Sequence, residues 1–240
     1  MKTVKVKASG CYDVKIGRGL LDTLGTELSA LASGSVLIVT DTNVAPLWLE
    51  RAEASLKAAG FTVYSAVLPA GEASKSLENY GKLLRLLADK HLTRTDTVVA
   101  LGGGVMGDLA GFAAATYLRG LRFVQVPTTL LAMVDSSVGG KTAVDLPEGK
   151  NLAGAFHQPA LVLCDIAALD TLPEETFREG CAEVIKTAIL FDRPLFDRLA
   201  QDGLNFDRED VIARCVAHKR DIVAEDEFET GRRKLLNLGP

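Results

Sequence analysis

Short apolar runs rich in β-branched residues alternate with segments of helical spacing through the first part of the chain. SVLIVTD at 35–41 and TDTVVALGGG at 95–104 are typical of buried strands, and each is followed by a segment with helical periodicity. Strands that alternate with helices predict an α/β fold with a mostly parallel sheet. From 171 onward helical periods predominate. We therefore expect an N-terminal Rossmann-like domain, 1–170, and an incomplete all-helical domain, 171–240.

Composition and charge exclude several classes of protein. The formal net charge is -4 and no basic tract is present, which argues against nucleic acid as a partner. No apolar run reaches the roughly 20 residues that span a bilayer, and the N-terminus lacks the apolar core of a signal peptide. No membrane association is expected. The four cysteines form no CxxC pair, which argues against disulfides or a cysteine zinc site and favours a reducing cytoplasm.

A glycine-rich turn follows the predicted strand at 95–104. Gly102, Gly104 and Gly107 match G-x-G-x-x-G between a strand and a helix, where backbone N–H groups and the helix dipole can hold a pyrophosphate. The acid usually found about 20 residues later is missing, since position 122 is Arg122. The motif therefore predicts a nucleotide site, and a tight turn with close helix–strand packing is the alternative.

Asp41 ends a predicted strand, at the sheet edge where open α/β proteins bind ligands. Its carboxylate could hold a ribose hydroxyl or cap the next helix. Both interpretations remain open from the sequence.

Single charges stand among small and apolar residues between 115 and 159. This pattern favours a pocket for an anionic substrate, in which lysine and arginine bind phosphate or carboxylate. An ordinary loop with satisfied ion pairs is the alternative. The segment SSVGGKT is not a Walker A motif, because Asp135 stands six residues before Lys141. The polar residues of this segment are Arg119, Asp135, Lys141, Lys150, Asn151 and His157.

In the helical part, Glu183 and Lys186 are three residues apart and share a helix face. A surface salt bridge is the simplest interpretation, but Glu183 could also ligate a metal. Glu183, His157 and His218 together would supply the ligands of a His₂Glu zinc site. No spacing of the type H-x-x-x-H, which places two ligands on one helix face, supports this set. His91 is expected to interact with the dipole at a helix C-terminus.

Several long segments, in order, resemble those of the 3-dehydroquinate synthase family, and the form GKNLAGAFHQP favours this family over the sugar-phosphate cyclases that make inosose or valiolone compounds. The segments are TDTNV, LPAGEASKSL, VVALGGGVMGDLAGFAAATYLRG, QVPTTLLAMVDSSVGGKTAVDLPEGKNLAGAFHQP, LPEETFREGCAEVIKTAIL and VAHKRDIVAEDE with GRRKLLNLG.

The resemblance implies a cytoplasmic homodimer that uses NAD and a divalent metal, zinc or cobalt, to convert the phosphorylated sugar acid 3-deoxy-arabino-heptulosonate 7-phosphate to 3-dehydroquinate and phosphate. The implied NAD contacts are Asp41, Glu72, Lys75, Gly103, Gly104, Val105, Gly107, Asp108, Thr128, Thr129, Lys141, Lys150 and Thr171. The implied catalytic and substrate residues are Arg119, Asp135, Lys141, Asn151, Lys186, Lys219, Arg233 and Asn237. Glu183 is the implied metal ligand.

The family continues after R-x-x-x-N-L-G with a metal-binding histidine, whereas here Pro240 follows Gly239. The resemblance thus implies a C-terminally truncated enzyme whose metal site is incomplete, and which binds NAD but is inactive alone. A metal-dependent alcohol or glycerol dehydrogenase is one alternative, against which the lysines of GGK and GKN argue. A non-catalytic NAD-binding relative is another, and the missing histidines favour it.

Overall fold

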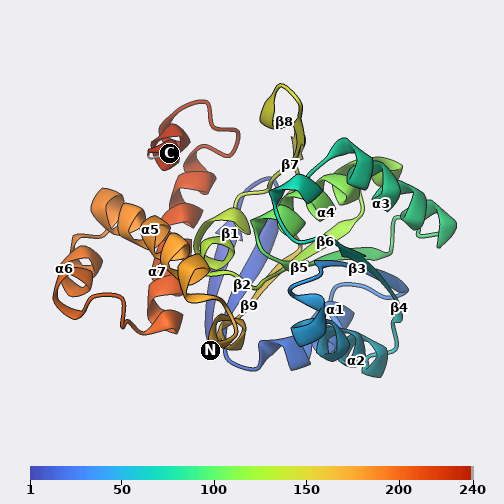
Figure 1. Ribbon diagram of the computed structural model, residues 1–240, viewed down its shortest axis with the longest axis horizontal. Helices are drawn as coiled ribbons and strands as arrows, with labels where there is room; N and C mark the ends of the chain where they lie inside the picture. Colours follow the sequence, from blue (N-terminus) through green and yellow to red (C-terminus); the bar gives the residue numbers. More distant parts are fainter. Residues whose placement is uncertain (239–240) are drawn as a thin grey trace.

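A computed structural model describes residues 1–238 and is built on a seven-stranded sheet of order β1-β2-β9-β6-β5-β3-β4 (Figure 1). β1 and β2 are antiparallel, and every other neighbouring pair is parallel. The mostly parallel α/β fold predicted from the sequence is therefore confirmed. The strands of this sheet are β1 Lys2–Lys7, β2 Cys11–Gly17, β3 Ser35–Asp41, β4 Thr62–Leu68, β5 Thr97–Gly102, β6 Arg122–Pro127 and β9 Leu161–Asp165.

The two faces of the sheet are covered by different helices. Val36 and Ile38 of β3 belong to one hydrophobic cluster, and the alternate residues Leu37 and Val39 belong to a second cluster on the opposite face. This double burial explains why the parallel strands read as continuous apolar runs. The first cluster is covered by α1 Leu24–Ser29 and α2 Glu50–Ala58, and the second by α3 Leu77–Asp89 and α4 Gly104–Thr116.

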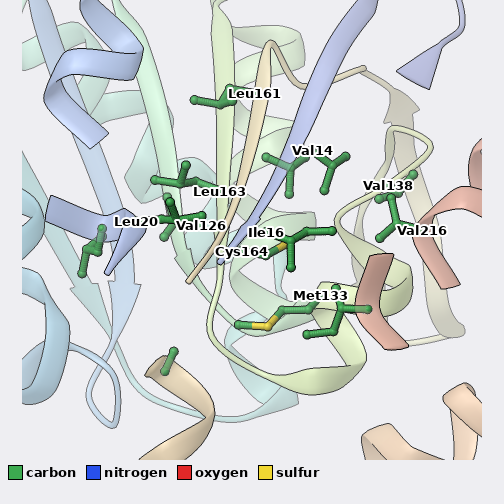
Figure 2. Packing of buried hydrophobic residues seen from close by; sticks show 14 of the residues in the cluster. Val14, Ile16, Leu20, Val126, Met133, Val138, Leu161, Leu163, Cys164 and Val216 are labelled. Carbon is green, nitrogen blue, oxygen red and sulfur yellow. The ribbon is translucent and has the colours of Figure 1, made fainter. Parts of the chain in front are cut away.

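Three α-helices follow the last strand of the sheet, and within 1–238 no strand occurs after Asp165. They are α5 Glu174–Phe191, α6 Arg193–Asp202 and α7 Arg208–Glu225. Val216 of α7 joins Val14 and Ile16 of β2 in one buried cluster (Figure 2). The division at 170 and 171 remains a proposal, because these helices and the sheet share this cluster. Gly239 and Pro240 of the resemblance lie outside the described residues.

A hairpin of β7 Lys141–Leu146 and β8 Gly149–Phe156 projects from the body of the molecule (Figure 1). The pattern of single charges predicted a pocket-lining segment here, but the two strands were not predicted. Short 3₁₀ or π turns complete the chain at Leu20–Thr23, Ala45–Leu49, Glu72–Ser74, Tyr117–Arg119, Ala132–Ser136, Ile166–Asp170 and Arg232–Asn237. None of the described helices combines the length and apolar character required to cross a bilayer.

Candidate active site

A cavity of about 980 Å³ lies at the carboxyl ends of three neighbouring parallel strands. Asp41 ends β3, Gly103 follows β5 and Thr128 follows β6, and all three line the cavity. Ligands of open α/β sheets bind at this edge. The sheet topology therefore brings together residues that lie nearly 90 positions apart in sequence, from Asp41 to Thr128. Other predicted residues that line this cavity are Glu72, Lys75, Gly104, Val105, Asp108, Thr129, Asp135 and Thr171.

The glycine turn forms a close-fitting wall of this cavity. The first N–H groups of helix α4, like those of any α-helix, have no intrahelical acceptor, and no side chain caps them because the N-cap residue is Gly103. A Cβ on Gly103 would lie 3.1 Å from Thr129 Cγ2. The hydroxyl Oγ1 of Thr128 is buried and has no hydrogen-bond partner among residues 1–238. Free N–H donors at the glycine turn, and an unsatisfied hydroxyl at the end of the neighbouring strand β6, fit a bound phosphate-containing cofactor such as a dinucleotide.

Gly107 has a different environment from the other glycines of the motif. It is a buried residue inside α4, and a Cβ there would lie 2.6 Å from Gln125 Oε1 on β6. The alternative of close helix–strand packing therefore applies to Gly107. Its contact with a dinucleotide stays a prediction.

Asp41 uses its two carboxylate oxygens differently. Oδ1 accepts hydrogen bonds from the N–H groups of Asn43 at 2.8 Å and Val44 at 3.1 Å, which caps the turn after β3. For Oδ2 the described residues offer no hydrogen-bond donor. The capping role and the predicted ribose contact are thus compatible, since each needs one oxygen.

Lys75 is the buried centre of a charged group between the sheet and the hairpin. Its Nζ lies 2.8 Å from Asp108 Oδ2, 3.9 Å from Glu72 Oε1 and 4.0 Å from Asp145 Oδ1. Lys150 Nζ lies 3.3 Å from the same Glu72 oxygen. Burial raises the pKa of Asp108, and the Lys75 ammonium opposes this shift. The fold thus joins Glu72, Lys75 and Lys150 at one side of the cavity.

A second cavity of about 540 Å³ adjoins the first, and Asp108, Asp135 and Ser136 line both. Lys141, Asn151 and Lys219 line the second cavity, as predicted for an anion pocket. Lys141 is paired with Glu229, an acid of the same wall. The two cavities therefore share one wall, and together we call them the cleft, with a glycine-lined half and a charged half.

Lys219 and Asp135 form a second largely buried charged contact of the cleft. Lys219 Nζ donates to Asp135 Oδ1 at 2.5 Å and to the Asp135 carbonyl at 2.8 Å. Burial alone would raise the pKa of Asp135, but Lys219 and the nearby Lys186 and Lys141 hold it below its usual value. Burial lowers the pKa of Lys219, and Asp135 opposes that shift. The pair is therefore ionised and mutually dependent.

Four predicted substrate residues do not line either cavity. Arg119 is exposed, in a left-handed backbone conformation with φ 66°. Lys186 Nζ donates to the Leu236 carbonyl at 2.7 Å, and Asn237 Nδ2 donates to Glu229 Oε1 at 2.7 Å. Arg233 is only 1% exposed and donates to the carbonyls of Gly139 and Glu227. Their predicted substrate contacts stay predictions.

Glu183 is paired with Lys186, whose Nζ lies 2.8 Å from Glu183 Oε2, and both side chains are mostly buried. The expected ion pair thus forms, but not at the surface. Burial and the nearby Asp135 raise the pKa of Glu183, against the effect of Lys186. A metal on Oε2 would compete with this lysine for the carboxylate.

The possible zinc site of Glu183, His157 and His218 does not form, so this interpretation was wrong. His157 Nε2 lies 2.9 Å from the Leu121 carbonyl oxygen, and His218 Nε2 lies 3.0 Å from Asp192 Oδ2. Across 1–238, no group of three histidine, cysteine or acidic side chains could hold a metal ion. The described residues therefore do not fit a complete metal site.

Several cleft residues were missed by the sequence analysis. Trp48 and Ser136 line the larger cavity and Glu229 lines the smaller one. Trp48 follows Asp41 at the carboxyl edge of β3, and that position was a usable signal. Nothing in the local pattern around Glu229 indicates its pairing with Lys141.

Two family models match consecutive parts of the chain. The model described as 3-dehydroquinate synthase N-terminal matches 65–179, and the model described as 3-dehydroquinate synthase C-terminal matches 180–240. A 3-dehydroquinate synthase from Desulforamulus reducens is 49% identical over 247 residues, covering 100% of this chain and 69% of the relative. One from Nitrobacter hamburgensis is 52% identical over 234 residues, covering 95% and 61%. The chain thus spans between 61% and 69% of the length of these relatives.

Solved structures share the arrangement of the chain. ValA, a 2-epi-5-epi-valiolone synthase from Streptomyces hygroscopicus described with NAD⁺ and Zn²⁺ bound, is 30% identical with a TM-score of 0.87, covering 99% of this chain and 68% of that one. A 2-deoxy-scyllo-inosose synthase is 25% identical with a TM-score of 0.90, covering 98% and 69%. Glycerol dehydrogenase from Schizosaccharomyces pombe, 17% identical with a TM-score of 0.67 and coverage of 86% and 60%, shares the fold alone.

Proposed function

Because this chain belongs to the 3-dehydroquinate synthase family, we propose that its protein converts 3-deoxy-arabino-heptulosonate 7-phosphate to 3-dehydroquinate and phosphate. It would act as a lyase of the shikimate pathway, in aromatic amino-acid biosynthesis. This proposal is supported above all by the adjacency of the two cavities, which share Asp108, Asp135 and Ser136 in their walls. A glycine-lined half suits a dinucleotide and a lysine-lined half suits a phosphorylated acid.

We propose that NAD occupies the larger cavity. Its pyrophosphate would lie against Gly103, Gly104 and the free N–H groups of α4, and its adenosine ribose would bind Asp41 Oδ2. When bound, NAD would take up a hydride from a ring alcohol of the substrate and return it later. Thr128 Oγ1 would gain in the cofactor the hydrogen-bond partner that it lacks. The same residues would orient the cofactor toward the smaller cavity.

The smaller cavity would hold the sugar acid. Lys141 and Asn151 would bind its phosphate or carboxylate and fix its orientation. Because burial lowers the pKa of Lys219, its ammonium would give up a proton more readily than an exposed lysine. Asp135, which stays ionised, would keep Lys219 Nζ directed at the junction of the two cavities.

The metal proposal is limited to Glu183 as one ligand of zinc or cobalt, and no step is assigned to the ion. ValA, described with Zn²⁺, supports a divalent metal in relatives of this fold. We also infer a cytoplasmic homodimer from the resemblance. Sedimentation of the purified chain would test its oligomeric state.

The proposed reaction is tested by mixing the 240-residue chain with 3-deoxy-arabino-heptulosonate 7-phosphate, NAD and zinc or cobalt. Phosphate release and dehydroquinate formation are measured together. Equal amounts of both products would support the synthase proposal and would contradict the expectation that this chain is inactive alone. Net NADH formation with a simple alcohol would instead favour a dehydrogenase. NAD binding without turnover would favour a non-catalytic protein, provided that the same chain extended to the length of the family is equally inactive.

A further inference from the structure

The β7–β8 hairpin is interrupted by an irregularity where it borders the cleft. Leu146 pairs with Gly149, and the next pair along the ladder is Val144 with Ala153. One residue of β7, Asp145, therefore faces three residues of β8, which are Lys150, Asn151 and Leu152. Such a bulge leaves backbone groups outside the regular ladder and redirects side chains.

Asp145 supplies the missing acceptor for this bulge. Its Oδ1 accepts a hydrogen bond from the Asn151 N–H at 2.8 Å. Asn151 has φ 58°, a left-handed conformation that few residues other than glycine and asparagine adopt readily. The carboxylate of Asp145 therefore holds Asn151 in an uncommon backbone conformation, at a position where Asn151 lines the smaller cavity.

The same residue also joins the hairpin to the other half of the cleft. The Asp145 N–H donates to the Lys75 carbonyl at 2.9 Å, and Ser76 and Asp145 form a parallel bridge. The Asp145 carboxylate lies 4.0 Å from Lys75 Nζ. On the bulge itself, Lys150 reaches Glu72 of the segment that lines the larger cavity.

We propose that Asp145 is a positioning residue that couples the two halves of the cleft. It fixes Asn151 toward the substrate through its carboxylate and fixes the bulge to the Glu72–Lys75 segment through its backbone. Occupation of the larger cavity by the dinucleotide would then order the bulge and increase affinity in the smaller cavity. This inference rests on the proposed function, because it takes the two ligands from it.

The test is a pair of calorimetric titrations of 3-deoxy-arabino-heptulosonate 7-phosphate into the full chain, without and with saturating NADH. NADH blocks turnover because it cannot accept a hydride. In the parent chain, NADH should lower the dissociation constant of the sugar acid. In Asp145→Ala the dissociation constant of the sugar acid should rise about tenfold, because a hydrogen bond to a charged acceptor is lost. The increase in sugar acid affinity that NADH causes in the parent should disappear in this variant. Asp145→Ala should change the dissociation constant of NADH less than it changes that of the sugar acid.

Two matched variants separate positioning from general disruption. Asp145→Asn keeps an acceptor for the Asn151 N–H and should retain the parent affinity for the sugar acid within about twofold. Glu148→Ala removes an exposed carboxylate from the same hairpin, to which no hydrogen bond or ion pair is made within 1–238, and should behave as the parent. Amide hydrogen exchange at Asn151 should speed up about tenfold in Asp145→Ala alone.

Three results would overturn the inference, and the last of them is distinguishable because it also removes the proposed function. If the parent binds both ligands but Asp145→Ala matches Glu148→Ala, Asp145 does not position Asn151. An Asp145→Asn variant that loses sugar acid affinity while Asn151 exchange is unchanged would have the same meaning, even if the alanine variant fails to fold. If the parent binds neither ligand, the proposed function fails first and the coupling fails with it.

Discussion

Lys219 Nζ lies 2.5 Å from Asp135 Oδ1, although 84 residues of chain separate them. The contact fixes α7 to the turn Ala132–Ser136, at the junction of the two cavities. It is therefore both a structural tie and part of the candidate site.

Asp135→Asn should destabilise the chain by about 3 kcal/mol, because it leaves the Lys219 ammonium buried without a counter-charge. The free energy of unfolding in urea measures this change. The matched control is Lys57→Met, which breaks an exposed helical pair with Glu53 and should change stability little. Equal stability of both variants would show that the Asp135 site is more hydrated than its burial suggests.

Asp41→Asn should weaken NAD binding about tenfold with little change in stability. An asparagine retains the Oδ1 acceptor for the Asn43 and Val44 N–H groups but loses the charge that would strengthen a ribose hydrogen bond. Quenching of Trp48, the single tryptophan of the chain and part of the cavity wall, reports binding. If Asp41→Asn binds NAD as tightly as the parent and Asp41→Ala is less stable, Asp41 acts only as a cap.

Gly107→Ala should destabilise the chain and weaken NAD binding together. The new Cβ would lie 2.6 Å from Gln125 Oε1, so either the buried Gln125 side chain or α4 and the glycine turn that it carries must move. Gly81→Ala is the control, because Gly81 lies in α3 with open space around its Cβ position. That change should stabilise the chain by about 0.5–1 kcal/mol. Thermal unfolding distinguishes the two variants by the sign of the shift.

Asp192 should make stability depend on pH in the acid range. Burial alone would raise its pKa, but hydrogen bonds from Arg214, His218 and the Leu195 N–H lower the pKa from 3.8 to about 2. A carboxyl whose pKa is lower in the folded state stabilises the protein above its unfolded pKa. This contribution, about 2 kcal/mol, is lost as pH falls from about 4 to 2.

Asp192→Asn should lower the urea midpoint at pH 7, and the difference from the parent should shrink between pH 4 and 2. Asp192 also caps the N-terminus of α6, and a difference that stays constant through this range would assign the loss to the changed cap rather than to the charge.

The sequence was informative where one local pattern decides the structure. β3 and β5 were recognisable because both of their faces are buried, which leaves a continuous apolar run. The hairpin at 141–156 was missed for the opposite reason. The bulge at Lys150–Leu152 and the cleft-facing Lys141 and Asn151 break the alternation that marks a strand.

Hydrogen-bond partners that are distant in sequence could not be predicted from local sequence patterns either. The sequence shows three histidines but not what they contact. His157 contacts Leu121 and His218 contacts Asp192, and both pairs depend on tertiary packing. The cavity residues at the ends of β3, β5 and β6 were predictable because sheet topology places such ends at one edge. The positions of Arg233 and Lys186 depend on how the last helices fold back, and no periodicity encodes that.

Val14 and Ile16 of β2 share a buried cluster with Val216 of α7, so the sheet and this helix should fold cooperatively. The cleft forms only when both are folded. Melting α7 would expose the face of β2 that it covers, so the free-energy cost of releasing the helix approaches that of global unfolding. Proteases should therefore find few partly open states in which the sheet survives without the helix. Lys219, carried on α7, would then reach the dinucleotide edge of the sheet only in the fully native ensemble.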